Sequence, residues 1–234
     1  MVTAIILAGG LGTRLAQTVP HLPKALAPIQ GIPFLKLLFD QLEKAAIVSK
    51  IILALGHKAA SIESFIQSQI PDIPLELSIE LSPLGTGGAL LHALNIPCSE
   101  TLLVLNGDTH FDLPLSAFLN YHQTCKADIT LACRQVPDTS RYGSVVFDSS
   151  SRITAFREKS STPQPGWINA GIYLIEKKLL SPLEPGIRSI ENDFFPQFLK
   201  KNFFAFPHQG SFVDIGTPSS YNEAQEILKP WITQ

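Results

Sequence analysis

A glycine-rich segment near the N-terminus has the composition of a phosphate-binding loop. Gly9, Gly10 and Gly12 follow directly on an apolar run that ends at Ala8. Glycine has no Cβ, so backbone N–H groups in such a loop can come close to a polyphosphate. The alternative is a tight turn from a strand into a helix. No complete P-loop or dinucleotide fingerprint accompanies these glycines, which argues against a P-loop or dehydrogenase site.

Two cations, Arg14 and Lys24, stand shortly after the glycines. Such groups can hold the β- and γ-phosphates of a nucleoside triphosphate and stabilise the charge on a departing pyrophosphate. Each alone could be a solvated surface charge. Together with the glycine loop, they indicate a triphosphate site.

Two aspartates far apart in the sequence are candidate metal ligands. Asp108 follows an apolar strand and should lie at the carboxyl edge of a parallel sheet, where ligands of open α/β folds bind. A carboxylate there suits Mg²⁺, which prefers oxygen ligands. Asp108 could instead be a turn residue, and Asp214, which precedes a predicted helix, could be its N-terminal cap.

Taken in order, these segments resemble the nucleoside-diphosphate-sugar pyrophosphorylases, a family of sugar-1-phosphate nucleotidyltransferases. The family pattern L-A-G-G-x-G-T-R-L, followed by P-K-x-L-x-P, is complete at residues 7–15 and 23–28. The match extends over nearly the whole chain. It implies transfer of a nucleotidyl group from a nucleoside triphosphate to a sugar 1-phosphate with release of pyrophosphate, and Mg²⁺ held by Asp108 and Asp214.

The resemblance also implies a set of site residues. The catalytic residues are Arg14, Lys24, Asp108 and Asp214. The nucleotide-binding residues are Leu7, Ala8, Gly9, Gly10, Gly12, Thr13, Glu80, Gly85 and Thr86. The sugar-phosphate residues are Gly143, Glu158, Lys159 and Asn169, with the lysine on the phosphate. The family usually places proline after that lysine, whereas Ser160 stands here.

Within the family, the chain most resembles the D-glycero-D-manno-heptose 1-phosphate guanylyltransferases. The resemblance rests on the short length, on G-T-G-G at residues 85–88 and on D-I-G-T-P at residues 214–218. GTP is favoured as the donor because the Glu80 carboxylate only accepts hydrogen bonds and guanine offers two neighbouring donors. A mannose-1-phosphate guanylyltransferase, or a relative that transfers uridylyl or cytidylyl groups, stays an alternative.

Two other functional classes compete with this interpretation. A non-catalytic nucleotide-sensing subunit could share the fold, but it would be expected to have lost charged site residues that are all present here. A glycosyltransferase would typically carry a D-x-D metal motif after a strand. Asn106 stands where the first carboxylate of that motif would be.

The elements that position these residues alternate between strands and helices, as in an α/β domain. We expect strands over residues 4–8, 51–55, 75–81, 101–105, 167–175 and 203–206, and helices over 34–46, 61–70, 88–94, 190–199 and 218–228. Strands over 128–134, 144–147 and 153–157 predict a small antiparallel lobe. The predicted fold is a Rossmann-like, mainly parallel sheet flanked by helices, with residues 160–166 as a mobile surface loop.

The overall composition fits one domain over residues 1–234, with a nucleotide-binding half at about 1–110 and a sugar-phosphate half at about 111–234. The chain carries 18 basic and 20 acidic residues without a basic run, so we expect small-molecule partners rather than nucleic acid or a membrane. The oligomeric state stays open. The N-terminus carries no leader pattern and the three cysteines form no pair motif, which predicts buried thiols in a cytoplasmic protein.

Overall fold

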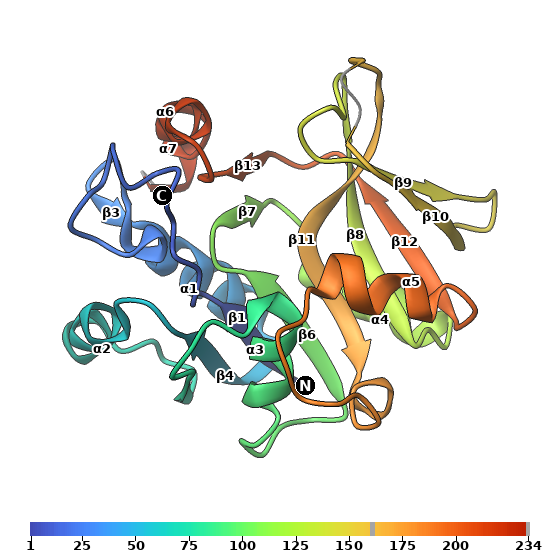
Figure 1. The fold of residues 1–234 in the computed structure, drawn as a ribbon, viewed down its shortest axis with the longest axis horizontal. Helices are drawn as coiled ribbons and strands as arrows, with labels where there is room; N and C mark the ends of the chain where they lie inside the picture. Colours follow the sequence, from blue (N-terminus) through green and yellow to red (C-terminus); the bar gives the residue numbers. More distant parts are fainter. Residues whose placement is uncertain (160–161, 233–234) are drawn as a thin grey trace.

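A seven-stranded sheet forms the centre of the structure, a computed structural model that describes residues 1–159 and 162–232 (Figure 1). The strand order is β12 (Phe203–His208), β8 (Ile129–Val136), β11 (Gly166–Glu176), β6 (Thr101–Asn106), β1 (Val2–Leu7), β4 (Val48–Leu55) and β5 (Leu75–Ile79). β11 runs antiparallel to β6 and β8, while the other paired neighbours run parallel.

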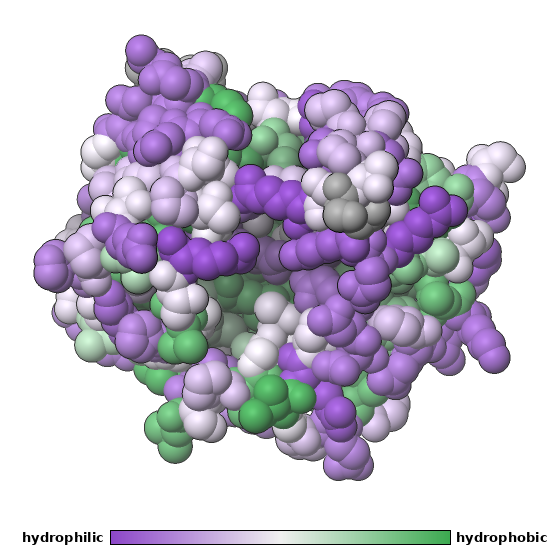
Figure 2. All heavy atoms as spheres, turned by 45° about the horizontal axis from the view of Figure 1, so that its top comes forward, coloured by the Kyte–Doolittle hydropathy of each residue, from purple (hydrophilic) through white to green (hydrophobic). Residues whose placement is uncertain are grey.

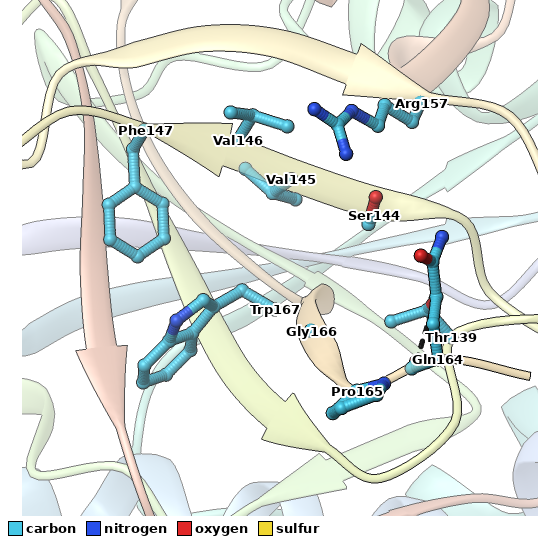
Figure 3. A pocket seen from close by; sticks show the side chains of 10 residues that line it. All are labelled: Thr139, Ser144, Val145, Val146, Phe147, Arg157, Gln164, Pro165, Gly166 and Trp167. Carbon is cyan, nitrogen blue, oxygen red and sulfur yellow. Dashed lines mark hydrogen bonds between the residues drawn. The ribbon is translucent and has the colours of Figure 1, made fainter.

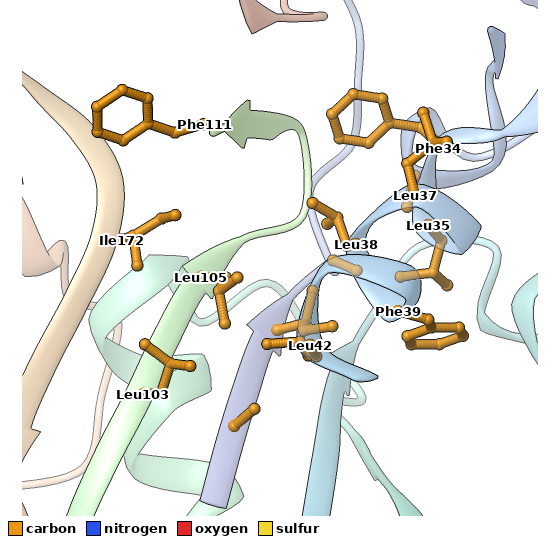
Figure 4. Packing of buried hydrophobic residues seen from close by; sticks show 14 of the residues in the cluster. Phe34, Leu35, Leu37, Leu38, Phe39, Leu42, Leu103, Leu105, Phe111 and Ile172 are labelled. Carbon is orange, nitrogen blue, oxygen red and sulfur yellow. The ribbon is translucent and has the colours of Figure 1, made fainter. Parts of the chain in front are cut away.

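Hydrophobic cores on both faces of this sheet explain why its strands read as continuous apolar runs. Ala4 and Ile6 of β1 belong to one cluster, and Ile5 between them belongs to the other. The first cluster receives the buried leucines and phenylalanines of α1 (Phe34–Ala45), together with Leu103 and Leu105 of β6 (Figure 4). It also receives residues of α2 (Ala59–Ser68), α4 (Leu115–Thr124) and α6 (Pro218–Ile227). The second receives α3 (Gly85–Ala93) and α5 (Phe195–Phe198).

Three two-stranded sheets accompany the central one. They are β9 with β10 (Ser144–Phe147 and Ile153–Arg157), β7 with β13 (Thr109–Phe111 and Phe212–Asp214) and β2 with β3 (Pro28–Ile29 and Ile32–Pro33). Short helical turns cover Lys24–Leu26 and Lys177–Leu179, and α7 (Lys229–Ile232) follows α6. The β7–β13 pair joins segments about a hundred residues apart, which matters for the site below.

The predicted fold class is confirmed, and several predicted elements need correction. Strand 128–134 is β8 of the central sheet and not part of a separate lobe, which consists of β9 and β10. The predicted helix at 190–199 is a π-helical turn, Ile190–Phe194, that leads into α5. The helix predicted from residue 88 begins at Gly85.

A further correction is α4, which the sequence interpretation missed, although Leu115, Phe118, Leu119 and His122 are spaced along one buried helical face. Cys133 is buried as expected, but Cys98 and Cys125 are half-buried. The helices in the described part of the chain are too short or too polar to span a bilayer. Ser160 and Ser161, in the loop predicted at 160–166, lie outside the described residues.

Gly171 generates a stability prediction, because it lies where the β8–β11 register shifts and β11 presses on β6. Its φ is +74°, and a Cβ there would lie 3.0 Å from Asn106 Nδ2. Gly31 has a similar φ, +83°, but open space around the same position. Gly31→Ala should therefore cost only the backbone strain of about 1–2 kcal/mol, whereas Gly171→Ala should add about 1–3 kcal/mol of overpacking. Urea unfolding of both variants measures the loss in free energy of unfolding. Equal losses would show that β6 shifts at no cost to make room for the added methyl group.

Candidate active site

A cavity of about 420 Å³ lies where the parallel strands β1 and β6 end side by side, with Leu7 opposite Asn106. Figure 2 shows a hollow on this face, with hydrophilic residues along its rim. The cavity, whose lining does not include Asp214, brings together the residues predicted for nucleotide binding and three of the four predicted for catalysis: Leu7, Ala8, Gly9, Gly10, Gly12, Thr13, Arg14, Lys24, Glu80, Gly85, Thr86 and Asp108. Their assembly comes from four separate segments of the chain, so it could not follow from any one motif.

The ends of β1 and β6 are fixed against each other by a close backbone approach. The Gly107 N–H donates to the Leu7 carbonyl at 2.9 Å. A Cβ on Gly107 would lie 2.8 Å from that same carbonyl oxygen, a distance that side chains essentially never show. Glycine at this position therefore allows the loop that carries Asp108 to lie directly beside the loop that carries the N-terminal glycines.

The two predicted cations converge on one point of the cavity. Lys24 forms an ion pair with Asp108, and its side chain is only 15% exposed. A Cβ built on Gly216 would lie 3.5 Å from Lys24 Nζ and 3.7 Å from Arg14 Nη2. Positive charge is therefore concentrated beside Asp108, as binding of a polyphosphate requires.

Asp214 reaches the same region through the β7–β13 pair. Asp214 pairs with Thr109, and the Ile215 N–H donates to the Asp108 carbonyl at 2.9 Å. The N-terminal cap of α6 is Thr217, whose side chain accepts from the Ser220 N–H, so the alternative that Asp214 caps this helix is wrong. Two carboxylates from distant segments thus lie at neighbouring strand ends.

This donor set fits a divalent ion that prefers oxygen and retains water. Mg²⁺ is commonly held by one or two carboxylates together with substrate phosphates and water. The described residues contain no group of three or more His, Cys, Asp or Glu side chains able to enclose a metal, as structural zinc would need. Asp108 and Asp214 would therefore hold Mg²⁺ together with a bound triphosphate.

Glu80 lies in the cavity wall just after β5. Its Oε2 accepts from the Leu84 N–H at 3.3 Å, and Oε1 lies beside the glycines Gly9 and Gly56. A Cβ on Gly56 would be 2.7 Å from Oε1, so these glycines make room for the carboxylate. Partial burial raises the pKa of Glu80 above its ordinary value.

The residues predicted for the sugar phosphate lie outside the lining of this cavity. Gly143, with φ +77°, packs against the backbone of the next hairpin strand, where its Cβ would be 2.7 Å from the Arg157 carbonyl and 3.7 Å from Lys159 N. The structure thus groups Gly143 with the exposed residues Glu158 and Lys159. Asn169 lies on β11 and donates to the Tyr173 hydroxyl at 2.9 Å.

A second hollow of about 240 Å³ lies on the same lobe, between β9 and the start of β11 (Figure 3). Its lining includes Ser144, Arg157 and Trp167, together with Phe147, whose ring is 5.6 Å from that of Trp167. None of the predicted site residues lines it. It is therefore separate from the cavity that holds the two cations and Asp108.

A hydrogen-bond network that the sequence interpretation missed connects Thr86, in the cavity lining, to Asn169. The Tyr173 hydroxyl accepts from Asn169 and donates to Glu191 at 3.2 Å. The other carboxylate oxygen of Glu191 accepts from the Thr86 hydroxyl at 3.2 Å, and Thr86 in turn accepts from the Ile190 N–H. The Thr86 side chain is thus committed to the protein. No local pattern marks Glu191, because its partners lie up to 105 positions away.

Arg141 is the second functional candidate that was missed as an individual residue. Its Nη2 donates to both oxygens of Asp214, at 2.9 and 3.0 Å. The only signal in the sequence was its place in the R-Y-G segment, two residues before Gly143.

Known proteins similar to this chain agree with this geometry. The nucleotidyl transferase family model matches residues 3–229. The chain is 39% identical to the D-glycero-alpha-D-manno-heptose 1-phosphate guanylyltransferase of Aneurinibacillus thermoaerophilus, covering 98% of this chain and 99% of that protein. It is 32% identical to the mannose-1-phosphate guanylyltransferase of Mycobacterium tuberculosis, but covers only 62% of that longer protein.

A solved structure is similar over the same span. It is HddC from Yersinia pseudotuberculosis complexed with GMP-PN, with a TM-score of 0.87 and 36% identity over 98% of this chain and all of that chain. The match to the family model and the full-length relative confirm the resemblance first seen in the motifs. The chain belongs to the nucleotidyl transferase family.

Proposed function

We propose that this protein transfers a guanylyl group from GTP to D-glycero-D-manno-heptose 1-phosphate, giving the nucleotide sugar and pyrophosphate. The observation that carries the proposal is the single cavity that collects the glycine loop, both cations, Glu80 and Asp108. A relative named as a heptose 1-phosphate guanylyltransferase, aligned over its whole length, supports the choice of sugar. Mg²⁺ as cofactor, small-molecule partners and a cytoplasmic location belong to the same proposal.

The test of the reaction is pyrophosphate release that requires both substrates. Four nucleoside triphosphates should be combined with heptose, mannose and glucose 1-phosphates, with each substrate also omitted in turn. Pyrophosphate should appear only when both are present, and fastest with GTP and the heptose. Release from a nucleoside triphosphate alone would contradict the proposal and indicate hydrolysis of the nucleotide. Release from no combination would favour a non-catalytic sensing subunit.

The chemistry requires two anions to be brought together, because a sugar phosphate attacks the α-phosphorus of a triphosphate. A phosphate monoester has its second pKa near 6, so the nucleophile is already ionised at neutral pH and no general base is needed. Arg14 and Lys24 would hold the departing pyrophosphate, and Lys159 the sugar phosphate. When bound, Mg²⁺ supplies additional neutralisation of the triphosphate charge. Catalysis then consists of positioning and charge stabilisation.

Asp108→Asn should lower kcat by about 100-fold or more, because it removes a charged group from the reacting centre. The matched control is Asp40→Asn, which removes an exposed ion pair with Lys36 far from the cavity and should leave kcat unchanged. Circular dichroism should show both variants folded. A folded Asp108→Asn enzyme with more than about a tenth of wild-type kcat would exclude a metal role for Asp108.

Lys159→Ala should raise KM for the sugar 1-phosphate about tenfold or more while leaving nucleotide affinity nearly unchanged, because a charge-assisted bond to the phosphate is lost. Steady-state kinetics and calorimetric titration with GTP separate the two effects. Lys178→Ala is the control, since that lysine pairs with Asp128 and lines none of the site. Equal losses for both substrates would place Lys159 elsewhere in the mechanism.

Glu80→Gln should reduce the preference for GTP over UTP by roughly 10- to 100-fold, the discrimination expected from one unpaired buried polar group. The measurement is kcat/KM for both nucleotides in the wild type and the variant. Glu76→Gln, on the strand β5 that ends just before Glu80, removes a carboxylate paired with Lys50; it is the control and should keep the ratio. If the ratio is unchanged in Glu80→Gln, the base is read elsewhere, by backbone groups around Gly85.

A further inference from the structure

Asp214 is held by contacts that the proposed mechanism does not use. Arg141 donates to both carboxylate oxygens, the Tyr142 hydroxyl donates to Oδ2 at 2.7 Å, and the Gly216 N–H donates to Oδ1 at 2.8 Å. The Asp214 side chain is only 15% exposed, against 38% for Arg141. A carboxylate so enclosed has little capacity left for another ligand.

Asp108 also pairs with a cation of the protein, Lys24, although its side chain is more exposed, at 39%. Both carboxylates proposed for Mg²⁺ are therefore neutralised by cations of the protein itself. A divalent ion that binds between them must displace these cations, since ammonium or guanidinium and metal compete for the same lone pairs. Once displaced, Lys24 can pair with a triphosphate in the same cavity, which it lines. A displaced Arg141 needs a different anion as its partner.

The position of Arg141 indicates which anion that is. It precedes by two residues Gly143, whose backbone packs against Arg157 and Lys159 on the neighbouring hairpin strand. Its guanidinium lies over the Tyr142 ring at 5.2 Å, and besides Asp214 it donates to the side chains of Thr217 and Ser220 at the start of α6. A guanidinium presents a planar fork of donors that suits phosphate oxygens.

We propose that Arg141 exchanges partners during the reaction: it holds Asp214 in the free enzyme, and binds the phosphate of the sugar 1-phosphate once the metal and nucleotide occupy the site. This rests on the proposed function for the identity of the second anion. Arg141 then keeps Asp214 from standing unpaired beside Asp108 before substrate arrives. It also couples the two substrates, because nucleotide binding releases the group that the sugar phosphate needs.

The first half of the proposal is tested with the metal alone. Mn²⁺ binding to the nucleotide-free protein can be followed by the electron paramagnetic resonance signal of free Mn²⁺. Arg141→Gln should tighten Mn²⁺ binding by about fivefold or more, because the competitor for Asp214 is gone. Arg157→Gln removes a cation of the same lobe that makes no described contact with Asp214, and should change the affinity less than about twofold. Unchanged affinity in Arg141→Gln, or equal gains in both variants, would overturn the exchange.

The second half is tested by calorimetric binding of mannose 1-phosphate to enzyme saturated with Mg²⁺ and α,β-methylene-GTP. Arg141→Gln should weaken this binding about tenfold or more while the affinity for the GTP analogue stays nearly constant. If Arg141→Gln binds the sugar phosphate as tightly as the wild type, the exchange is wrong and the proposed function stands. If the wild type neither binds any sugar 1-phosphate nor releases pyrophosphate, the proposed function itself fails, and the exchange with it.

Discussion

The site depends on the parallel pairing of β1 with β6. This register places Leu7 opposite Asn106, so the glycine loop and the loop that carries Asp108 leave the sheet at the same edge. The Gly107 N–H closes that edge on the Leu7 carbonyl, at a distance that admits no side chain on Gly107. Because both strands are buried on both faces, a slip of this register would move Ile5 and Ile6 into the wrong cores. The hydrophobic cores therefore fix the position of the chemical groups.

The second carboxylate is positioned by a much weaker element. β7 and β13 pair over three residues each, and one backbone bond at each end extends the contact, from Ile215 to Asp108 and from Asp112 to Ser211. The capped start of α6 adds support, since Thr217 and Ser220 satisfy each other and Ser220 also donates to Asp214. Side-chain contacts with Arg141 and Tyr142 complete the enclosure. One ligand thus belongs to the central sheet, while the other depends on local pairing and polar contacts.

The contrast between these elements explains what the sequence could predict. Residues 4–8 were predictable as a strand because an apolar run ends at glycines. The glycines, Arg14 and Lys24 that follow have residue types and spacing that by themselves indicate a phosphate site. The sequence interpretation missed the α4 helix because the segments that follow it are strand-like and little helix was expected between them. Strand β8 was assigned to the wrong sheet because pairing partners are not readable from local pattern. Arg141 and Glu191 were missed for the same reason: Arg141 meets Asp214 across 73 positions and Glu191 meets Thr86 across 105.

Two groups of polar contacts at the cavity differ in how they can respond to a ligand. In one group, behind Thr86 of the cavity lining, the buried Tyr173 hydroxyl joins Asn169 to Glu191, and burial keeps the pKa of Tyr173 well above its usual range. Hydrogen bonds in such a network hold one arrangement, because breaking any one leaves a buried polar group unpaired. The other group consists of two ion pairs, Asp108 with Lys24 in the cavity lining and Asp214 with Arg141 beside it, and each pair has one solvent-exposed member. Partly solvated ion pairs contribute little net stability, so their members can change partners at small cost. A site that must admit two phosphate-bearing substrates and release two phosphate-bearing products is served by this division, in which a rigid group of contacts sets the geometry and an exchangeable group balances the charge.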